Sequence, residues 1–387
     1  MNNAEQQGLI IVPGDLPDVE LASIVKDAAE CGLVLGSPIS LDLATQRLAE
    51  QASLVTVVAV DGSTSLEQLR QLVVEAEPHP VIALNSGARP ADLKQLLAVG
   101  VADVLDADSA DTERNRASLA RHLRRAELVA ESETLRAELE QSLALLKEDQ
   151  QAGRHVQRKM LPPQEAVIND YRFEYRIKPS LFLSGDFIDF FRISESLSMF
   201  YLADISGHGA SSAFVTVLLK NMTNRLLRNY NRGSSFHILS PTDVLWRINK
   251  ELLDTGLGKH LTIFVGLLDR IENTLQYGVG GHYPMPILQQ NGKAEFLAGT
   301  GMPVGLFDDA EFDGRIVELE NEFSLTLFSD GILEVMDQPD LKAKEQALLD
   351  AAARGYRDLN ELAVALGVDQ VVDAPDDIAA LSVSRVV

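Results

Sequence analysis

The sequence predicts an α/β domain with a doubly wound parallel sheet, then a long helix, then an α+β domain. Short apolar runs alternate with amphipathic stretches over residues 1–113, which is the pattern of βα units. Residues 114–160 contain no proline and one glycine, which favours a continuous helix. From residue 161 to 387, strand patterns and helix patterns each cluster, so this part is α+β.

The first part supplies five strands and four helices. Strands are expected where the runs are short, apolar and rich in β-branched residues, and helices where apolar positions recur every three or four residues. The expected strands are 9–12, 33–35, 54–60, 81–84 and 102–105. The expected helices between them are 19–30, 41–51, 65–76 and 90–99.

The linker helix carries apolar residues at steps typical of a coiled-coil seam. They are Leu128, Leu135, Leu139, Leu146, Val156 and Met160. Polar residues interrupt the seam, so two interpretations stand: a parallel helix pair that makes a homodimer, or a monomeric amphipathic linker. The helix should stop by Leu161, because Pro162 and Pro163 cannot continue it.

The third part contains seven expected strands and four expected helices. The strands are 172–177, 187–191, 199–204, 261–268, 274–279, 323–328 and 378–383. The helices are 211–228, 241–254, 342–354 and 358–366.

Composition excludes several classes of protein. With 34 Lys and Arg against 57 Asp and Glu, the chain has a formal charge of -23, which argues against binding nucleic acid or an anionic membrane. The single cysteine, Cys31, excludes an internal disulfide and a Cys-rich zinc module. No signal peptide or membrane span is visible, so we expect a cytoplasmic location.

Four acidic motifs each adjoin an expected strand. They are Ser184-Gly185-Asp186-Phe187, Ala203-Asp204-Ile205-Ser206-Gly207-His208-Gly209, Phe328-Ser329-Asp330-Gly331 and Pro375-Asp376-Asp377-Ile378. Any one alone would be interpreted as a turn or a solvated loop. Together they predict a site for hard divalent cations, because gathered carboxylates repel one another unless a cation lies among them. A two-metal site of this kind hydrolyses phosphate esters.

These motifs resemble those of the metal-dependent Ser/Thr protein phosphatases, the PPM superfamily, and in particular its bacterial SpoIIE/RsbU-like branch. Three further stretches are similar to that branch: residues 157–162 (QRKMLP), 280–286 (GGHYPMP) and 301–306 (GMPVGL). The resemblance covers about residues 157–387. It implies a β-sandwich flanked by helices, with two Mn²⁺ or Mg²⁺ ions as cofactors.

The resemblance also implies roles for the carboxylates. Asp204 would bridge both ions, and Asp186 would hold one of them together with the backbone carbonyl of Ile205. Asp330 and Asp376 would hold the other ion.

Five further residues have weaker assignments. Asp377 would at most tune the site, and Asp189 is either a supporting residue or a solvated strand residue. The resemblance places Ser206 where some relatives carry a His proposed as general acid, so acid catalysis by His is in doubt. His208 is interpreted first as a loop residue and second as a proton donor, and His282 as structural.

The N-terminal part resembles the receiver domains of response regulators in pattern and strand positions. Asp61 stands at the phospho-acceptor position. However, Pro13 and Gly14 replace the acidic pair that would hold Mg²⁺, and Ala107 stands at about the position of the usual Lys. Without those charges, phosphoryl transfer to Asp61 lacks stabilisation. We therefore expect a pseudo-receiver in which Asp61 is a turn residue that is not phosphorylated.

The resulting prediction is a Ser/Thr phosphoprotein phosphatase in a bacterial partner-switching, stress-response pathway. Its implied substrate is a phosphorylated STAS-type anti-sigma antagonist. The alternative is an RssB-type adaptor that binds a sigma factor or anti-sigma protein with little catalysis; the four retained carboxylates argue against it. A third possibility is a scaffold that dimerises through the linker helix and binds no metal.

Overall fold

The computed structural model describes residues 6–11, 18–40, 43–44, 47–48, 54–85, 91–106, 112–207, 209–356, 358–371 and 374–386. The chain divides into two compact units, residues 1–144 and 145–387, and each is described by itself. Across the described residues, every helix is too short or too polar to cross a membrane. Most of the helix expected at 41–51 lies outside the described residues, although 43–44 and 47–48 are helical.

The first unit contains a parallel five-stranded sheet in the order β2-β1-β3-β4-β5. Its strands are β1 (Gln6–Ile11), β2 (Leu33–Leu35), β3 (Thr56–Val60), β4 (Val81–Asn85) and β5 (Asp103–Asp106). Its helices include α1 (Asp18–Glu30), α3 (Leu66–Ala76) and α4 (Leu93–Val99). Apart from the helix expected at 41–51, the predicted elements of this unit are present, with boundaries that differ by a few residues.

The sheet of this unit is covered on both faces. On one face, Ile24 of α1 and Leu119 of the next helix, α5 (Thr112–Met160), join a buried cluster with sheet residues such as Val57. On the other face, Leu72 of α3 and Leu96 of α4 pack with Val58 and other sheet residues. The predicted doubly wound architecture is confirmed, because helices occupy both faces of a parallel sheet.

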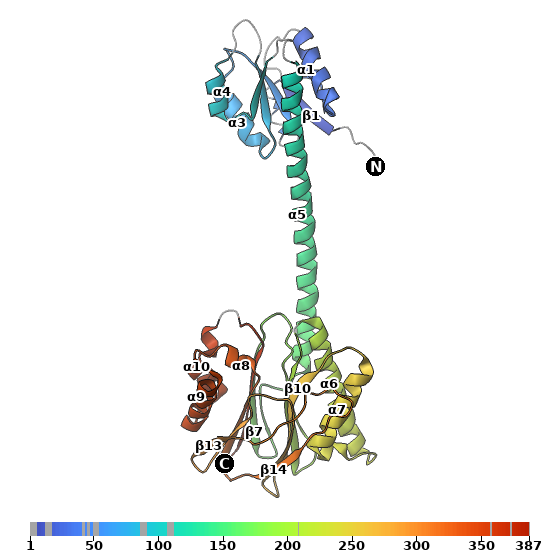
Figure 1. Ribbon diagram of the computed structural model, residues 1–387, viewed down its shortest axis with the longest axis vertical. Helices are drawn as coiled ribbons and strands as arrows, with labels where there is room; N and C mark the ends of the chain where they lie inside the picture. Colours follow the sequence, from blue (N-terminus) through green and yellow to red (C-terminus); the bar gives the residue numbers. More distant parts are fainter. Residues whose placement is uncertain are drawn as a thin grey trace. The chain divides into compact units, whose positions relative to one another are not determined.

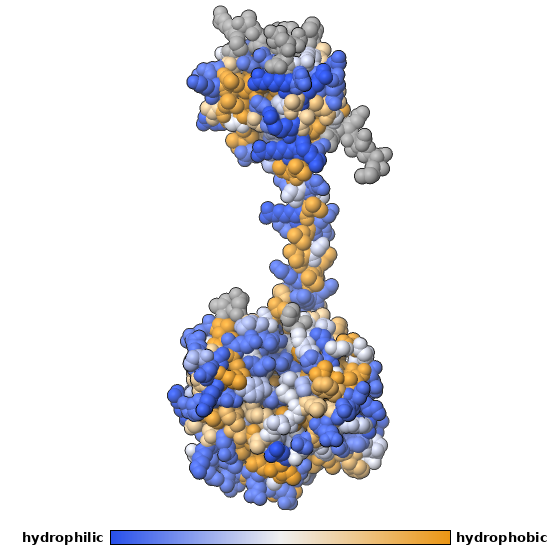
Figure 2. Space-filling view, viewed as in Figure 1, coloured by the Kyte–Doolittle hydropathy of each residue, from blue (hydrophilic) through white to orange (hydrophobic). Residues whose placement is uncertain are grey.

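Helix α5 (Thr112–Met160) is a single helix of 49 residues that ends two residues before Pro162. Five seam residues are half exposed in the single chain, from 49 % for Leu128 to 60 % for Leu139. Figure 2 shows hydrophobic, orange surface interspersed with hydrophilic, blue surface along α5. The sixth, Met160, packs against the buried cluster beneath α6 and α7 in the second unit, so it belongs to a core and not to an exposed seam.

The second unit is a sandwich of two antiparallel sheets. One sheet has the order β14-β11-β10-β9-β8 and the other β13-β12-β15-β16-β7-β6. The first contains β8 (Phe187–Arg192), β9 (Leu197–Ile205), β10 (Leu261–Asp269), β11 (Thr274–Gly280) and β14 (Gly314–Glu318). The second contains β6 (Glu165–Ile168), β7 (Tyr171–Lys178), β12 (Ile287–Gln290), β13 (Lys293–Phe296), β15 (Phe323–Phe328) and β16 (Ile378–Arg385).

Helices cover the outer faces of this sandwich. Helices α6 (Ala210–Asn231) and α7 (Pro241–Thr255) lie on the five-stranded sheet, and α8 (Gly331–Glu334), α9 (Leu341–Arg354) and α10 (Leu359–Ala365) lie on the six-stranded sheet. Figure 1 shows the two groups on opposite sides of the sheets. An aromatic cluster that includes Phe173, Phe190 and Phe264 fills the space between the sheets. This is the predicted sandwich flanked by helices.

The pairing of strands brings the acidic motifs to one end of the sandwich. In the five-stranded sheet, Phe187 at the start of β8 is opposite Ala203, next to the end of β9. In the six-stranded sheet, Phe328 at the end of β15 pairs with Ala380, near the start of β16. Each acidic motif therefore adjoins the end of a strand, and these strand ends lie at the same end of the sandwich.

Candidate metal centre

One oxygen of the Asp186 carboxylate accepts a hydrogen bond, and the other has no hydrogen-bond partner. Its side chain is buried, with 1 % of the residue exposed. The Ser329 hydroxyl donates a hydrogen bond to its Oδ2 at 2.7 Å, and the Asp186 amide donates to the Ser184 hydroxyl at 3.1 Å. Oδ1 is buried without a hydrogen-bond partner. A buried carboxylate oxygen in this state needs a partner such as a cation.

Gly185 allows the first and second motifs to touch. A Cβ atom at Gly185 would lie 2.9 Å from the carbonyl oxygen of Ile205 and 3.2 Å from that of Gly207. The Ile205 amide also donates to the Gly185 carbonyl at 3.3 Å. The glycine is needed here for close backbone approach, which places the Ile205 carbonyl beside the Asp186 loop.

Asp377 joins the fourth motif to the first. Its Oδ2 accepts from the Gly185 amide at 2.6 Å, and its Oδ1 accepts from the Ser180 amide at 2.6 Å and the Ser180 hydroxyl at 2.9 Å. The third motif approaches as well, because a Cβ on Gly331 would lie 2.0 Å from the Asp377 carbonyl oxygen. Asp377 therefore fixes backbone around the site, and both its oxygens are already used.

The carboxylates raise one another's pKa. Burial, and next the charge of Asp204, raise the pKa of Asp186 well above its ordinary value. Burial and then Asp330 raise the pKa of Asp204 to about 7. Burial and then Asp376 raise the pKa of Asp330. Each of the four motifs is thus within electrostatic range of another, and a bound cation would relieve the repulsion.

The donor set fits a hard divalent cation. It consists of carboxylate and carbonyl oxygens, which Mg²⁺ and Mn²⁺ prefer, and it includes the unpartnered Oδ1 of Asp186. In the part of the chain that the structure describes, no three His, Cys, Asp or Glu side chains already stand close enough to chelate one ion. Protein ligands would therefore supply part of each coordination sphere, as is usual for Mg²⁺, which keeps several waters.

Asp189 does not belong to this group of carboxylates. Both its oxygens lie 2.7 Å from the Lys220 ammonium of α6, and the Tyr201 hydroxyl donates to it at 3.3 Å. Side chains alternate along a strand, so Asp189 on β8 faces α6, whereas residue 186 is three positions away. The two alternatives for Asp189, a supporting residue and a solvated one, are both replaced by a buried ion pair that fastens α6 to the sheet.

Two histidines were considered from the sequence, His208 and His282. His208 lies outside the described residues. His282 is buried, and burial lowers its pKa to about 4; its ring is 6.1 Å from that of Phe264. His282 therefore lies in the core, as its structural interpretation predicts.

Asp61 in the first unit is a turn residue. It is exposed, and its Oδ1 accepts from the Ser63 amide at 2.8 Å and from the Ser63 hydroxyl at 2.6 Å. These hydrogen bonds lower its pKa. The geometry is that of an Asx turn, in agreement with the favoured interpretation.

Gln157 connects the end of α5 to the site. Its side-chain amide donates to the Ser184 carbonyl at 2.7 Å and to the Thr216 hydroxyl at 3.2 Å. Its Oε1 accepts from the Ser184 amide at 3.2 Å. One buried side chain thus joins α5, the loop before Asp186 and helix α6. Gln157 and Ser329 stand in motifs that the sequence singled out, but nothing in the motifs indicated these contacts.

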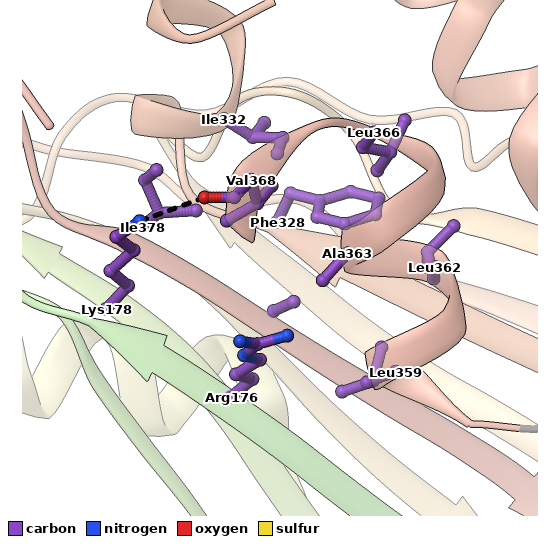
Figure 3. Close-up of a pocket in the computed structure, with 11 residues that line it drawn as sticks. Arg176, Lys178, Phe328, Ile332, Leu359, Leu362, Ala363, Leu366, Val368 and Ile378 are labelled. Atoms are coloured by element: carbon purple, nitrogen blue, oxygen red, sulfur yellow. Dashed lines mark hydrogen bonds between the residues drawn. The ribbon is translucent and has the colours of Figure 1, made fainter. Parts of the chain in front are cut away.

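A small apolar cavity of about 20 Å³ lies beside the third motif. Phe328, Ile332 and Ile378 line it together with residues of α10, as Figure 3 shows. Lys178 closes one side by donating to the Val368 carbonyl at 2.9 Å. The lining contains none of the acidic-motif carboxylates, so the candidate site is the carboxylate cluster and not this cavity.

Comparison with known proteins agrees with this arrangement. Residues 194–386 match the family described as Stage II sporulation protein E (SpoIIE). Phosphoserine phosphatase RsbP of Bacillus subtilis is 27 % identical over 194 residues, which cover 49 % of this chain and 46 % of RsbP. Regulator of RpoS of Escherichia coli K12 is 23 % identical over 259 residues, covering 65 % of this chain and 74 % of that protein.

The fold is also found in a solved structure. The SiaA-PP2C domain of Pseudomonas aeruginosa superposes with a TM-score of 0.52 at 18 % identity, covering 64 % of this chain and 99 % of that domain. The chain spans under half the length of RsbP and 36 % of Protein IcfG of Synechocystis, another relative. The predicted resemblance to the SpoIIE branch of PPM phosphatases is confirmed for the second unit.

Proposed function

We propose that the chain is a metal-dependent phosphatase of serine or threonine phosphoproteins, a function that the match of residues 194–386 to the SpoIIE family supports. The observation that carries the proposal is the buried Asp186 carboxylate, whose Oδ1 has no partner while Asp204 stands within electrostatic range. RsbP, a relative named as a phosphoserine phosphatase, supports the same chemistry.

The residues that would hold two Mn²⁺ or Mg²⁺ ions are Asp186, Asp204, Asp330, Asp376 and the carbonyl of Ile205. Bound ions of this kind polarise phosphoryl oxygens and lower the pKa of a coordinated water, which can then attack phosphorus in line. Ser329 orients Asp186 by holding its Oδ2. Asp377 keeps the Gly185 amide in place, which leaves Asp376 as the ligand of that pair.

The proposed substrate is a phosphorylated STAS-type anti-sigma antagonist in a partner-switching pathway. The support is the family of the second unit, whose resemblance implies such substrates. A sigma factor or anti-sigma protein would then be a further partner of the pathway.

The linker helix is proposed to carry regulation from the pseudo-receiver to the site. Its half-exposed leucines give it an apolar stripe that a second copy could cover, so we propose a homodimer. At its end, Gln157 contacts the Ser184 backbone and Thr216. A rotation or shift of α5 would therefore displace the loop that carries Asp186.

The adaptor alternative is not favoured. Regulator of RpoS is similar to this chain over 259 residues, but an adaptor has no use for four acidic motifs held together by hydrogen bonds. The scaffold alternative has the same difficulty.

The test is phosphate release from a phosphoserine peptide by the full chain in EDTA, Mg²⁺ or Mn²⁺. We expect release with a metal, none in EDTA, and loss of release in Asp204→Asn. Asp309→Asn is the matched control, because Asp309 is exposed and lies outside the acidic motifs. If the full chain is silent with every metal, residues 145–387 are assayed alone. Silence of that unit as well would contradict the proposal and favour the adaptor.

A further inference from the structure

Ser206, two residues after Asp204, has every polar group bonded. Its amide donates to the His260 carbonyl at 2.9 Å, and its hydroxyl accepts from the His260 amide at 3.2 Å. Its carbonyl accepts from the Lys259 ammonium at 2.8 Å and from the Ser212 hydroxyl at 3.2 Å. We call Ser206, Ser212, Lys259 and His260 the Ser206 clamp.

The clamp continues the sheet beyond the end of a strand. Asp204 pairs with Thr262 and Ile205 with Leu261 across β9 and β10. His260 and Ser206 stand at the next position along these two segments and are hydrogen bonded to each other. The clamp therefore extends the pairing of β9 and β10 from the expected bridging ligand, Asp204, into the loop before α6.

Lys259 supplies the charged contact of the clamp. Its ammonium also lies 3.3 Å from the Ser212 hydroxyl, and Ser212 in turn donates to the Gly207 carbonyl at 2.8 Å. A Cβ at Gly207 would lie 3.2 Å from the ammonium, and Gly207 has φ +75°, so a glycine is suited to this place. Charge-assisted hydrogen bonds are stronger than neutral ones, so Lys259 is the member of the clamp that fixes the Ser206 carbonyl most firmly.

The orientation of the peptide group between Ile205 and Ser206 affects two expected metal ligands, the Asp204 carboxylate and the Ile205 carbonyl. The peptide plane between Ile205 and Ser206 contains the Ile205 carbonyl, and the Ser206 amide in that plane is fixed by His260. On its other side, Lys259 and Ser212 hold the Ser206 carbonyl. The backbone that presents Asp204 and the Ile205 carbonyl is thus restrained from the residue that follows them.

We propose that Lys259 is a positioning residue of the metal centre, which acts through the Ser206 carbonyl to keep the Asp204 carboxylate and the Ile205 carbonyl oriented toward one cation. This rests on the proposed function. Two of the three ammonium donors are directed to protein groups, which favours positioning over a direct grip on a substrate phosphate.

The experiment measures Mn²⁺ binding to the full chain by calorimetry, for Lys259→Met, Lys259→Arg and the control Lys293→Met. Lys293 is an exposed lysine on β13. We expect Lys259→Met to weaken Mn²⁺ binding about tenfold, which is the usual effect of losing a residue that orients a ligand. Lys259→Arg should restore most of the affinity, and Lys293→Met should match the wild type. The unfolding midpoint in EDTA should be the same for all four proteins within about 2 °C.

Hydrolysis of p-nitrophenyl phosphate at saturating Mn²⁺ separates the two roles of Lys259. Positioning predicts an unchanged KM once the metal is saturating, whereas a raised KM with unchanged Mn²⁺ affinity would overturn the proposal in favour of a phosphate grip. Ser212→Ala gives an independent variant if Lys259→Met does not fold. It should weaken Mn²⁺ binding in the same direction, and unchanged binding would count against the clamp.

The outcomes also separate this inference from the proposed function. A wild type that binds Mn²⁺ and hydrolyses the ester, together with a Lys259→Met variant of equal Mn²⁺ affinity, would overturn only the role of Lys259. A wild type that neither binds Mn²⁺ nor hydrolyses the ester would overturn both.

Discussion

The Ser329 hydroxyl binds Oδ2 of Asp186 at 2.7 Å, across 143 positions of the sequence. The same hydroxyl accepts from the Ala379 amide at 2.8 Å. One side chain therefore connects the third acidic motif to the first and to the strand that follows the fourth. Because Oδ2 is taken, Oδ1 of Asp186 is the oxygen left for a cation.

Ser329→Ala should weaken Mn²⁺ binding by about tenfold or more, because Asp186 loses the group that orients it. The free energy of unfolding should fall by about 1–2 kcal/mol, since the Ala379 amide loses its partner. Calorimetry measures the affinity, and urea unfolding measures the stability.

The control is Ser324→Ala on β15, the strand that ends one residue before Ser329, where the Ser324 side chain is half-buried. Equal Mn²⁺ affinity of the Ser329 and Ser324 variants would contradict the orienting role. Urea unfolding of the second unit can be followed through Trp246, the one tryptophan of the chain.

Asp204→Asn should abolish phosphate release and yet stabilise the metal-free protein. Burial and neighbouring carboxylates raise the pKa of Asp204 to about 7, so its charge opposes folding above that pH. Removing the charge should raise the free energy of unfolding in EDTA at pH 8 by on the order of 2 kcal/mol. A lower unfolding midpoint in EDTA would mean that the carboxylates do not repel one another as the structure indicates.

The acidic site could be predicted from the sequence because its residues stand in compact motifs beside apolar strands. Its supports could not be predicted in the same way. The Asp377–Gly185 hydrogen bond joins positions 192 apart, and Lys259 stands in no motif at all. Such contacts depend on how strands pair, which local periodicity does not specify.

The strands of the second unit also include some that could be predicted from the sequence and some that could not. Long apolar strands were expected and are present, whereas β6, β12, β13 and β14 were not expected. They are only four or five residues long, and β13 and β14 have few buried positions. Strands β6, β13 and β14 lie at sheet edges, where a short strand buries too little apolar surface to leave a clear pattern. Strand β12 lies between β13 and β15, but its buried run is only two residues long. The sequence leaves two roles open for Asp189, a supporting residue of the site and a solvated strand residue, because its pairing with Lys220, 31 residues away, carries no signal in the sequence.

Gln157→Leu should change the activity of the full chain at least threefold while keeping the metal ligands intact. Leucine is similar in size but cannot bond Ser184 or Thr216, and buried backbone groups of Ser184 would lose their partners. Loss of these bonds should cost about 1–3 kcal/mol. Gln151→Leu on the exposed side of the same helix is the control. Identical phosphate release by both variants would show that the end of α5 does not influence the site.

Lys220→Met should destabilise the second unit by about 3 kcal/mol at pH 7, because it leaves the buried Asp189 carboxylate without its counter-ion. Pairing it with Asp189→Asn should recover much of the loss, since no buried charge then stays unpaired. Urea unfolding of the two single variants and the double variant measures the coupling. Additive losses in the double variant would indicate that the pair contributes nothing specific, and Lys293→Met, at an exposed lysine on β13, is the control.

His282 should make the second unit less stable below pH 6. Burial lowers its folded pKa from 6.5 to about 4, so between these values the unfolded chain binds a proton that the folded chain does not. Stability therefore rises with pH through this interval and reaches its full value above about pH 7, with a total change on the order of 3 kcal/mol.

The measurement is urea unfolding from pH 4 to 8, followed through Trp246. The stability difference between the wild type and His282→Gln should grow with pH over this range, whereas exposed His155→Gln serves as the control. A difference that stays constant from pH 4 to 8 would show that His282 is reached by solvent, and its core position would then be wrong.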